Sequence, residues 1–142
     1  MINKANLLAT LVGTIVMFFL GYLIWGMLTV EFFTQHSLAD LTKEPNIMYI
    51  FAGNLVMTFV ISSLYGKWAD GNYSAASGFK FGAMVGLFVG VGMGLLWFGS
   101  ANMMTLTGHI AEAGLDILFY AVIGAVVGFV YQKATKPALA LN

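Results

Sequence analysis

His109, Glu112 and Asp116 are the residues whose types and spacing could do chemistry, by binding a metal ion. Spacings of three and four residues place them on one face of a helix. Imidazole and carboxylate groups are ligands for divalent metals, and Glu31 and His36 could add to the set from another part of the chain. The pattern is short, so it indicates only a weak candidate for a metal site.

The same residues have an ordinary structural explanation. Acids near a helix N-terminus are favoured by the free backbone N–H groups and the helix dipole. His109 lies just before the expected helix start near Glu112, in the region where Thr107 or Gly108 could serve as the cap. Asp116 is the one ionisable residue expected to lie below a membrane interface, where an acid is a functional hypothesis by default. Capping or a local ion pair is the favoured interpretation, and metal binding is the alternative.

A second polar group repeats every four residues, as Asn54, Thr58 and Ser62. An amide without a partner in hydrocarbon is costly, so this row predicts hydrogen bonds between helices. Thr14, or backbone exposed at glycines, is the expected partner. The alternative is a polar track for a small neutral solute.

Reactive groups are scarce in this chain. It has no cysteine, which excludes thiol nucleophiles, thiolate metal sites and disulfides. It has no phosphate-binding loop, no His-Glu-x-x-His motif and no set of residues suited to a Ser–His–Asp triad. We therefore expect no enzymatic activity, no cofactor and no nucleic-acid partner. No acid or lysine is expected at the middle of a membrane, which argues against proton-coupled transport.

The composition defines the elements that must position these residues. Of 142 residues, 60% are hydrophobic and 8% are charged, whereas soluble domains are about a quarter charged. A helix needs about 20 apolar residues to cross a bilayer. The charge-free stretches predict an all-α integral membrane protein of one domain. Its four transmembrane helices are expected near residues 7–30, 47–66, 78–100 and 112–131, with a short tail at 133–142.

Lysine is distributed unevenly among the connections. The N-terminus, the loop after the second span and the C-terminus carry five of the six lysines, namely Lys4, Lys67, Lys80, Lys133 and Lys136. Connections rich in lysine stay in the cytoplasm, so both termini are predicted to be cytoplasmic. We expect the chain to lie in the inner membrane of a bacterium, with the lipid bilayer as its first partner.

Glycine recurs every four residues in the third span. This ladder consists of Gly78, Gly82, Gly86, Gly90 and Gly94, and the fourth span has a shorter version in Gly124 and Gly128. Such a glycine zipper lets another helix approach backbone to backbone. Packing within the chain is the favoured interpretation, and a seam with another subunit or a second copy is the alternative. A pore lined by glycine backbone is a third.

Several short motifs resemble a family of small bacterial four-span membrane proteins of unknown function. These are Gly21-Tyr22-Leu23-Ile24-Trp25-Gly26, the polar second span from Asn54 to Ser63, Gly82 to Trp97, and Asp116 to Gly128. The chain departs from that family in the first helix, where Leu23-Ile24-Trp25-Gly26 stands in place of a Trp-Tyr-Gly-Pro run. The resemblance implies a fold and no activity.

These observations favour a protein that acts by packing. We expect an oligomer-forming or accessory subunit of a larger membrane complex. The first alternative is a small channel or facilitator for a neutral or weakly polar solute. The second is a metal-binding membrane protein that uses the His109 group.

Overall fold

The computed structural model describes residues 3–40 and 43–135, and this part of the chain is helical, without a strand. In chain order its elements are α1 (Lys4–Leu23), η1 (Ile24–Leu28), α2 (Val30–His36), α3 (Ile47–Trp68), α4 (Ala75–Gly86), η2 (Leu87–Met93), α5 (Gly94–Ser100) and α6 (Leu106–Thr135). The two η elements are π-helical. The predicted all-α class is confirmed. Most of the predicted tail, residues 136–142, lies outside the described residues.

Four helical units are long and apolar enough to cross a membrane. They are Lys4–Leu28, Ile47–Trp68, Ala75–Ser100 and Leu106–Thr135. The first unit ends at Leu28, with Thr29 as its C-cap, so the expected span to residue 30 covers α1 and η1 and reaches only the first residue of the short α2. The last helix begins six residues before the expected Glu112, because its polar first two turns do not interrupt the helix.

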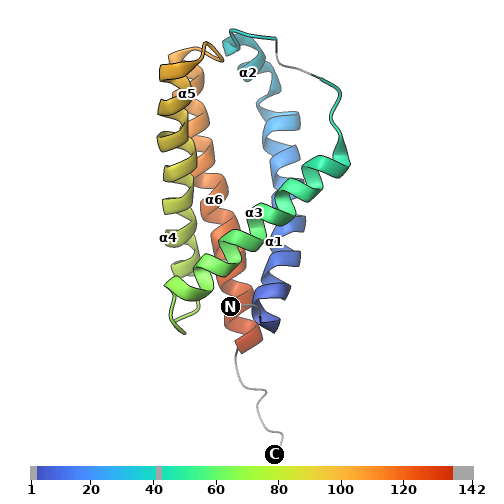
Figure 1. The fold of residues 1–142 in the computed structure, drawn as a ribbon, viewed down its shortest axis with the longest axis vertical. Coiled ribbons are helices and arrows are strands. Elements are labelled where there is room, and N and C mark those ends of the chain that lie inside the picture. Colours follow the sequence, from blue (N-terminus) through green and yellow to red (C-terminus); the bar gives the residue numbers. More distant parts are fainter. Residues whose placement is uncertain (1–2, 41–42, 136–142) are drawn as a thin grey trace, which may run out of the picture.

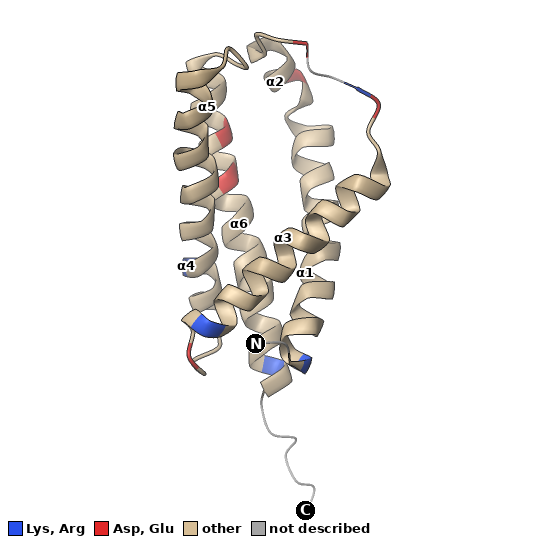
Figure 2. Ribbon diagram, in the orientation of Figure 1, with Lys and Arg blue, Asp and Glu red and all other residues tan. Residues whose placement is uncertain are grey.

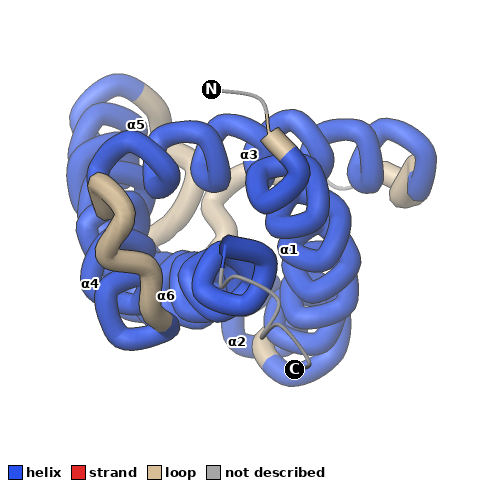
Figure 3. The backbone as a smooth tube through the Cα atoms, turned by 90° about the horizontal axis from the view of Figure 1, so that it is seen from below, coloured by secondary structure: helices blue, strands red, loops and turns tan. Residues whose placement is uncertain are grey.

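Helix α6 is the centre of the bundle (Figures 1 and 3). The unit of α4, η2 and α5 packs along one side of it, and α1 packs along another. Helix α3 runs obliquely across α1 and α6. We call the half that holds the start of α1 and the end of α6 the terminal half, and the half that holds α2 and α5 the distal half.

Charge is segregated between the two ends of the bundle (Figure 2). In the described part of the chain, the lysines lie at the terminal end except for Lys43, and the acids lie at the distal end except for Asp70. The asymmetry that the loops show in sequence is therefore also an asymmetry of the folded chain.

Glycine brings α4 and α6 into backbone contact. The glycines at which an added Cβ would collide with the α6 backbone are Gly78, Gly82, Gly86 and Gly90. From α6, Gly124 and Gly128 approach α4 in the same way. Gly94, the last member of the ladder, has nothing within 4 Å of the added Cβ. The ladder therefore joins helices of one chain over most of its length and is free at its distal end.

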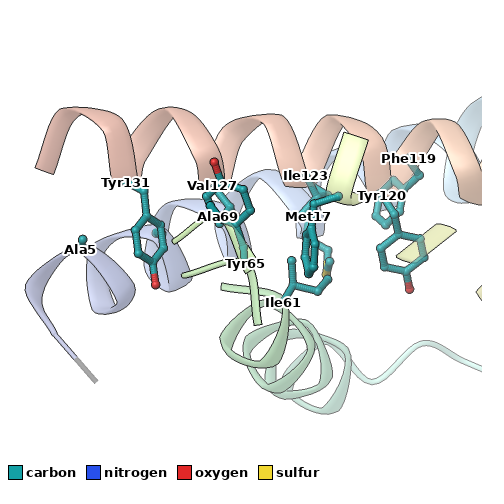
Figure 4. Close-up of a cluster of buried hydrophobic side chains, with 12 residues drawn as sticks. Ala5, Met17, Ile61, Tyr65, Ala69, Phe119, Tyr120, Ile123, Val127 and Tyr131 are labelled. Atoms are coloured by element: carbon teal, nitrogen blue, oxygen red, sulfur yellow. The ribbon is translucent and has the colours of Figure 1, made fainter. Parts of the chain in front are cut away.

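Hydrogen bonds between amide and hydroxyl groups join the helices of the terminal half. The Asn6 Nδ2 donates to Ser62 Oγ at 3.0 Å, to Ser63 Oγ at 3.1 Å and to Tyr131 Oη at 3.3 Å. Tyr131 Oη in turn donates to the Ser62 carbonyl at 3.0 Å. Figure 4 shows Tyr131 and Tyr65 among the buried apolar side chains of this half. One polar cluster thus joins α1, α3 and α6.

The turn between α3 and α4 is fixed by Tyr65. Its hydroxyl lies 2.6 Å from Ser77 Oγ and accepts the Ser74 N–H at 3.2 Å. Ser74 and Ser77 cap α4 reciprocally. Asp70 and Gly71 turn the chain between the two helices, with positive φ of 43° and 85°. This turn holds the start of the glycine ladder against α6.

Candidate functional site

Helix α6 presents His109, Glu112 and Asp116 to one cavity in the distal half. The cavity has a volume of about 390 Å³. Thr105, rather than the expected Thr107 or Gly108, supplies the side-chain bond at the helix start, where its Oγ1 accepts the Gly108 N–H at 3.2 Å. Glu112 and Asp116 therefore lie beyond the first turn, outside the reach of the helix dipole that was expected to explain them.

The other walls of this cavity come from four segments. Met57 comes from α3, Phe88 and Met93 come from η2, and Trp97 comes from α5. The turn before α6 adds Met103 and Met104. Apart from the three α6 side chains, the lining is therefore methionine, aromatic residues, valine and glycine. The cavity combines two carboxylates and one imidazole with polarisable apolar walls.

Trp25 reaches the cavity residues from the first helical unit. Its Nε1 donates to Glu112 Oε2 at 3.0 Å, and its ring packs edge-on against Phe119 with centroids 5.0 Å apart. Asp116, by contrast, makes no side-chain hydrogen bond to a described residue, and the buried Nε2 of His109 has no partner. Two polar groups of the cavity therefore have no hydrogen-bond partner among the described residues.

The candidate metal ligands do not form a coordination group. Within residues 3–40 and 43–135, no set of three or more His, Cys, Asp or Glu side chains is placed to hold a metal ion. His36 Nδ1 contacts the Phe32 carbonyl at 2.8 Å, and Glu31 accepts from Gln35 at 3.3 Å. The two residues that could have completed the set are engaged within α2.

Both π-helical segments flank this site. Segment η1 carries Trp25, and η2 carries the cavity residues Phe88, Val89, Gly90 and Met93. The wide turn at η1 is closed by the Thr29 N–H, which bonds to the Ile24 carbonyl at 2.9 Å. Such segments are frequent at functional sites, where they break the regular helix and redirect side chains. The apolar pattern of the sequence does not reveal them, although both contain glycine.

The polar row of α3 is divided by the fold. Thr58 and Ser62 are fully buried between α1 and α3, where Thr58 Oγ1 contacts Met17 Sδ at 3.5 Å and Ser62 Oγ donates to the Asn6 carbonyl at 3.1 Å. Asn54 is partly exposed and has no hydrogen bond to a described residue. The row therefore does not line the distal cavity.

Sequence reasoning missed Asn6 as the partner of the α3 row. A signal for it exists, because Asn6, Thr10 and Thr14 also repeat every four residues and all three are buried. The expected partner, Thr14, instead donates to the Thr10 carbonyl of its own helix at 2.7 Å. Matching polar rows on two spans would have indicated the α1–α3 contact.

Comparison with models of protein families, with curated proteins and with solved structures finds no match. The resemblance based on short motifs therefore gains no support from these comparisons, and functional inference rests on the geometry of the chain.

Proposed function

We propose that the protein is a non-catalytic membrane subunit that assembles laterally with other membrane helices. In this proposal the four long helices cross the inner membrane of a bacterium, with the lysine-rich terminal end in the cytoplasm. The segregation of charge between the two ends supports this orientation. The four apolar helices support the insertion.

The observation that carries the proposal is Asn54 in the distal half of α3. From Ile47 to Met57, every residue of α3 except Asn54 is exposed, so few contacts within the chain hold this stretch. Asn54 lies about 10 Å along the helix from Ile47, and its amide has no partner in the described chain. A polar group left unpaired in hydrocarbon costs several kcal/mol, so a partner helix that bonds this amide would be stabilised strongly.

The simplest partner is a second copy of the chain. An amide is both donor and acceptor, so two Asn54 side chains related by a two-fold axis can bond each other. Gly53 beside it has nothing within 4 Å of an added Cβ, which leaves room for close helix approach. A helix of another subunit with a polar side chain at this depth would satisfy the same amide.

The two alternatives drawn from sequence gain no comparable support. A solute path along α3 needs Thr58 and Ser62, and both are occupied in the α1–α3 contact. A metal function needs His109, Glu112 and Asp116 as a coordination group, which the described residues do not provide. Neither is therefore proposed.

Cysteine crosslinking in native membranes tests the proposal, because the chain has no cysteine of its own. We expect Gly53→Cys to crosslink to a partner chain through a short bifunctional maleimide. Gly99→Cys, at a site equally open but on α5, is the matched control and should not crosslink. The mass of the product separates a second copy, at twice 15.3 kDa, from another subunit.

Asn54→Leu and Asn54→Gln then test the amide itself. The leucine variant should abolish the crosslink at position 53, and the glutamine variant should retain part of it, because it keeps both a donor and an acceptor. Equal crosslinking of all variants, or a lone monomer by native mass spectrometry in mild detergent, would rule out this function.

A further inference from the structure

The distal cavity contains Glu112 and Asp116, and we call it the acidic cavity. It continues into an apolar groove between α3 and α4. This groove has a volume of about 490 Å³ and is lined by Val60 and Leu64 of α3 and by Phe81 and Val85 of α4. It shares residues with the acidic cavity from three elements, namely Met57, Phe88, Val89 and Tyr120. Cavity and groove therefore adjoin, one with carboxylates and the other without charge.

Of the described residues that line the cavity, His109 is the one basic group beside the carboxylates. Among the described residues, no lysine lines either the cavity or the groove. The Glu112 carboxylate has one bond, to Trp25, and Asp116 has none. With α6 across a bilayer, Asp116 lies about 15 Å from the helix start and about 7 Å inside the hydrocarbon. A carboxylate at that depth is stabilised by an organic cation, which brings its own positive charge.

The walls of the cavity select the kind of cation. Phe88, Trp97 and Tyr120 line the cavity, and aromatic rings attract a weakly hydrated cation such as an alkylammonium. Ca²⁺ and Mg²⁺ need about six or more oxygen ligands, which these walls do not supply, and the described residues hold no group of three or more side chains placed to bind a metal ion. The apolar groove suits an alkyl chain or ring attached to the head group.

We propose that the distal cavity and the adjoining groove bind a membrane-soluble organic cation. Its ammonium head lies against Glu112 and Asp116, and its apolar body lies along α3 and α4. The ladder of glycines has a second role here, because a Cβ at Gly90 would lie 2.8 Å from the Asp116 Cβ. The missing side chain at Gly90 gives Asp116 its space at the cavity wall. This proposal does not depend on lateral assembly, since Asn54 lines neither the cavity nor the groove.

Binding of radiolabelled dodecyltrimethylammonium to the full chain in nanodiscs, corrected for empty nanodiscs, tests the site. We expect saturable binding to the wild type. The double variant Glu112→Gln, Asp116→Asn should weaken it by about tenfold or more, because both negative charges are lost. The matched control removes two exposed acids elsewhere, as Glu31→Gln with Asp70→Asn, and should bind as the wild type does.

A second pair of variants tests the groove without touching the acids. Val60→Trp fills the groove from an exposed position on α3, so it should weaken binding while the chain stays folded. Val12→Trp, at an exposed position of α1 outside the groove, is its control. The proposal fails if the double acid variant binds as tightly as the wild type, or if neutral dodecanol competes as well as the cation does. It also fails if Val60→Trp leaves binding unchanged.

Discussion

The two halves of the bundle are held together in different ways. In the terminal half, backbone meets backbone at Gly78 and Gly124, and the buried Asn6 donates to hydroxyls of α3 and α6. In the distal half, Gly94 has no contact and Asp116 has no hydrogen bond to a described residue. The same helices are thus closely packed at one end and enclose an acidic cavity at the other.

This difference shows how a small chain combines stability with an open site. Close helix packing and buried hydrogen bonds supply the stability of membrane bundles, since lipid gives helices no hydrophobic reason to associate. The buried hydrogen bonds at Asn6 lie in the terminal half, whereas the close contact with α6 continues along the ladder only as far as Gly90. The π-helical segments, the cavity and the free stretch of α3 all lie away from the polar cluster at Asn6.

The largest contrast should come from adding one methyl group to the glycine ladder in each half. At Gly82 the new Cβ would overlap the Tyr120 carbonyl and lie 3.0 Å from the Ala121 Cα, neither of which can move as a side chain does. We expect Gly82→Ala to lower the free energy of unfolding by about 3 kcal/mol. Gly94→Ala meets nothing and should raise it by about 0.5 kcal/mol through helix propensity.

Unfolding by titration with sodium dodecyl sulfate in mixed micelles measures both variants. The comparison between the halves is wrong if the two substitutions change stability equally. It is also wrong if Gly94→Ala is the more damaging.

The next contrast replaces one asparagine in each half by leucine. Asn6→Leu removes three hydrogen bonds from the buried cluster, and we expect a loss of about 2 kcal/mol. Asn54→Leu removes no bond to a described residue and should leave the unfolding of the isolated chain within about 0.5 kcal/mol of wild type. The same titration measures both, and a loss at Asn54 as large as at Asn6 would place the distal half of α3 in the packed core.

Removing one tyrosine hydroxyl tests the α3–α4 turn, and the expected loss of stability is smaller. Tyr65→Phe keeps the buried ring but loses the bonds to Ser77 and Ser74, so we expect a loss of about 1 to 1.5 kcal/mol. Tyr22→Phe is the control, because Tyr22 is 60% exposed in the distal half of α1. Its stability should equal that of the wild type, and a matching loss at both positions would contradict a specific role for the turn.

Much of the fold could be predicted from the pattern of charge and glycine. The charge-free stretches predict four long helices, since a bilayer-length apolar run has few other uses. They misplace the start of α6, because His109 and Glu112 lie inside the helix and face a cavity rather than a loop. Periodicity counts residues along one helix, so it identifies the row at Thr58 but not the partner at Asn6.

The candidate site depends on contacts that no single stretch of sequence encodes. The bond from Trp25 to Glu112 joins residues 87 positions apart, and the cavity also needs η2 to leave the regular helix. The motif spacing indicated a group of acids, but only the packing shows which of them are left without partners. In such chains the signal to look for is a polar residue that neither caps a helix end nor pairs with another side chain.

The smallest contrast, and the sharpest test of an independent distal half, is Trp25→Phe. It removes the 3.0 Å bond to Glu112 while keeping an aromatic ring against Phe119, so we expect a global loss of about 0.6 kcal/mol or less. Local opening should respond more, with faster amide hydrogen exchange over residues 24–29 and an unchanged rate in the terminal half of α6. Trp68→Phe, in the terminal half, makes no such bond and should leave exchange over residues 24–29 as it is. If Trp25→Phe instead speeds exchange evenly along α1 and α6, the two halves open as one unit, and the division of stability and site between them does not hold.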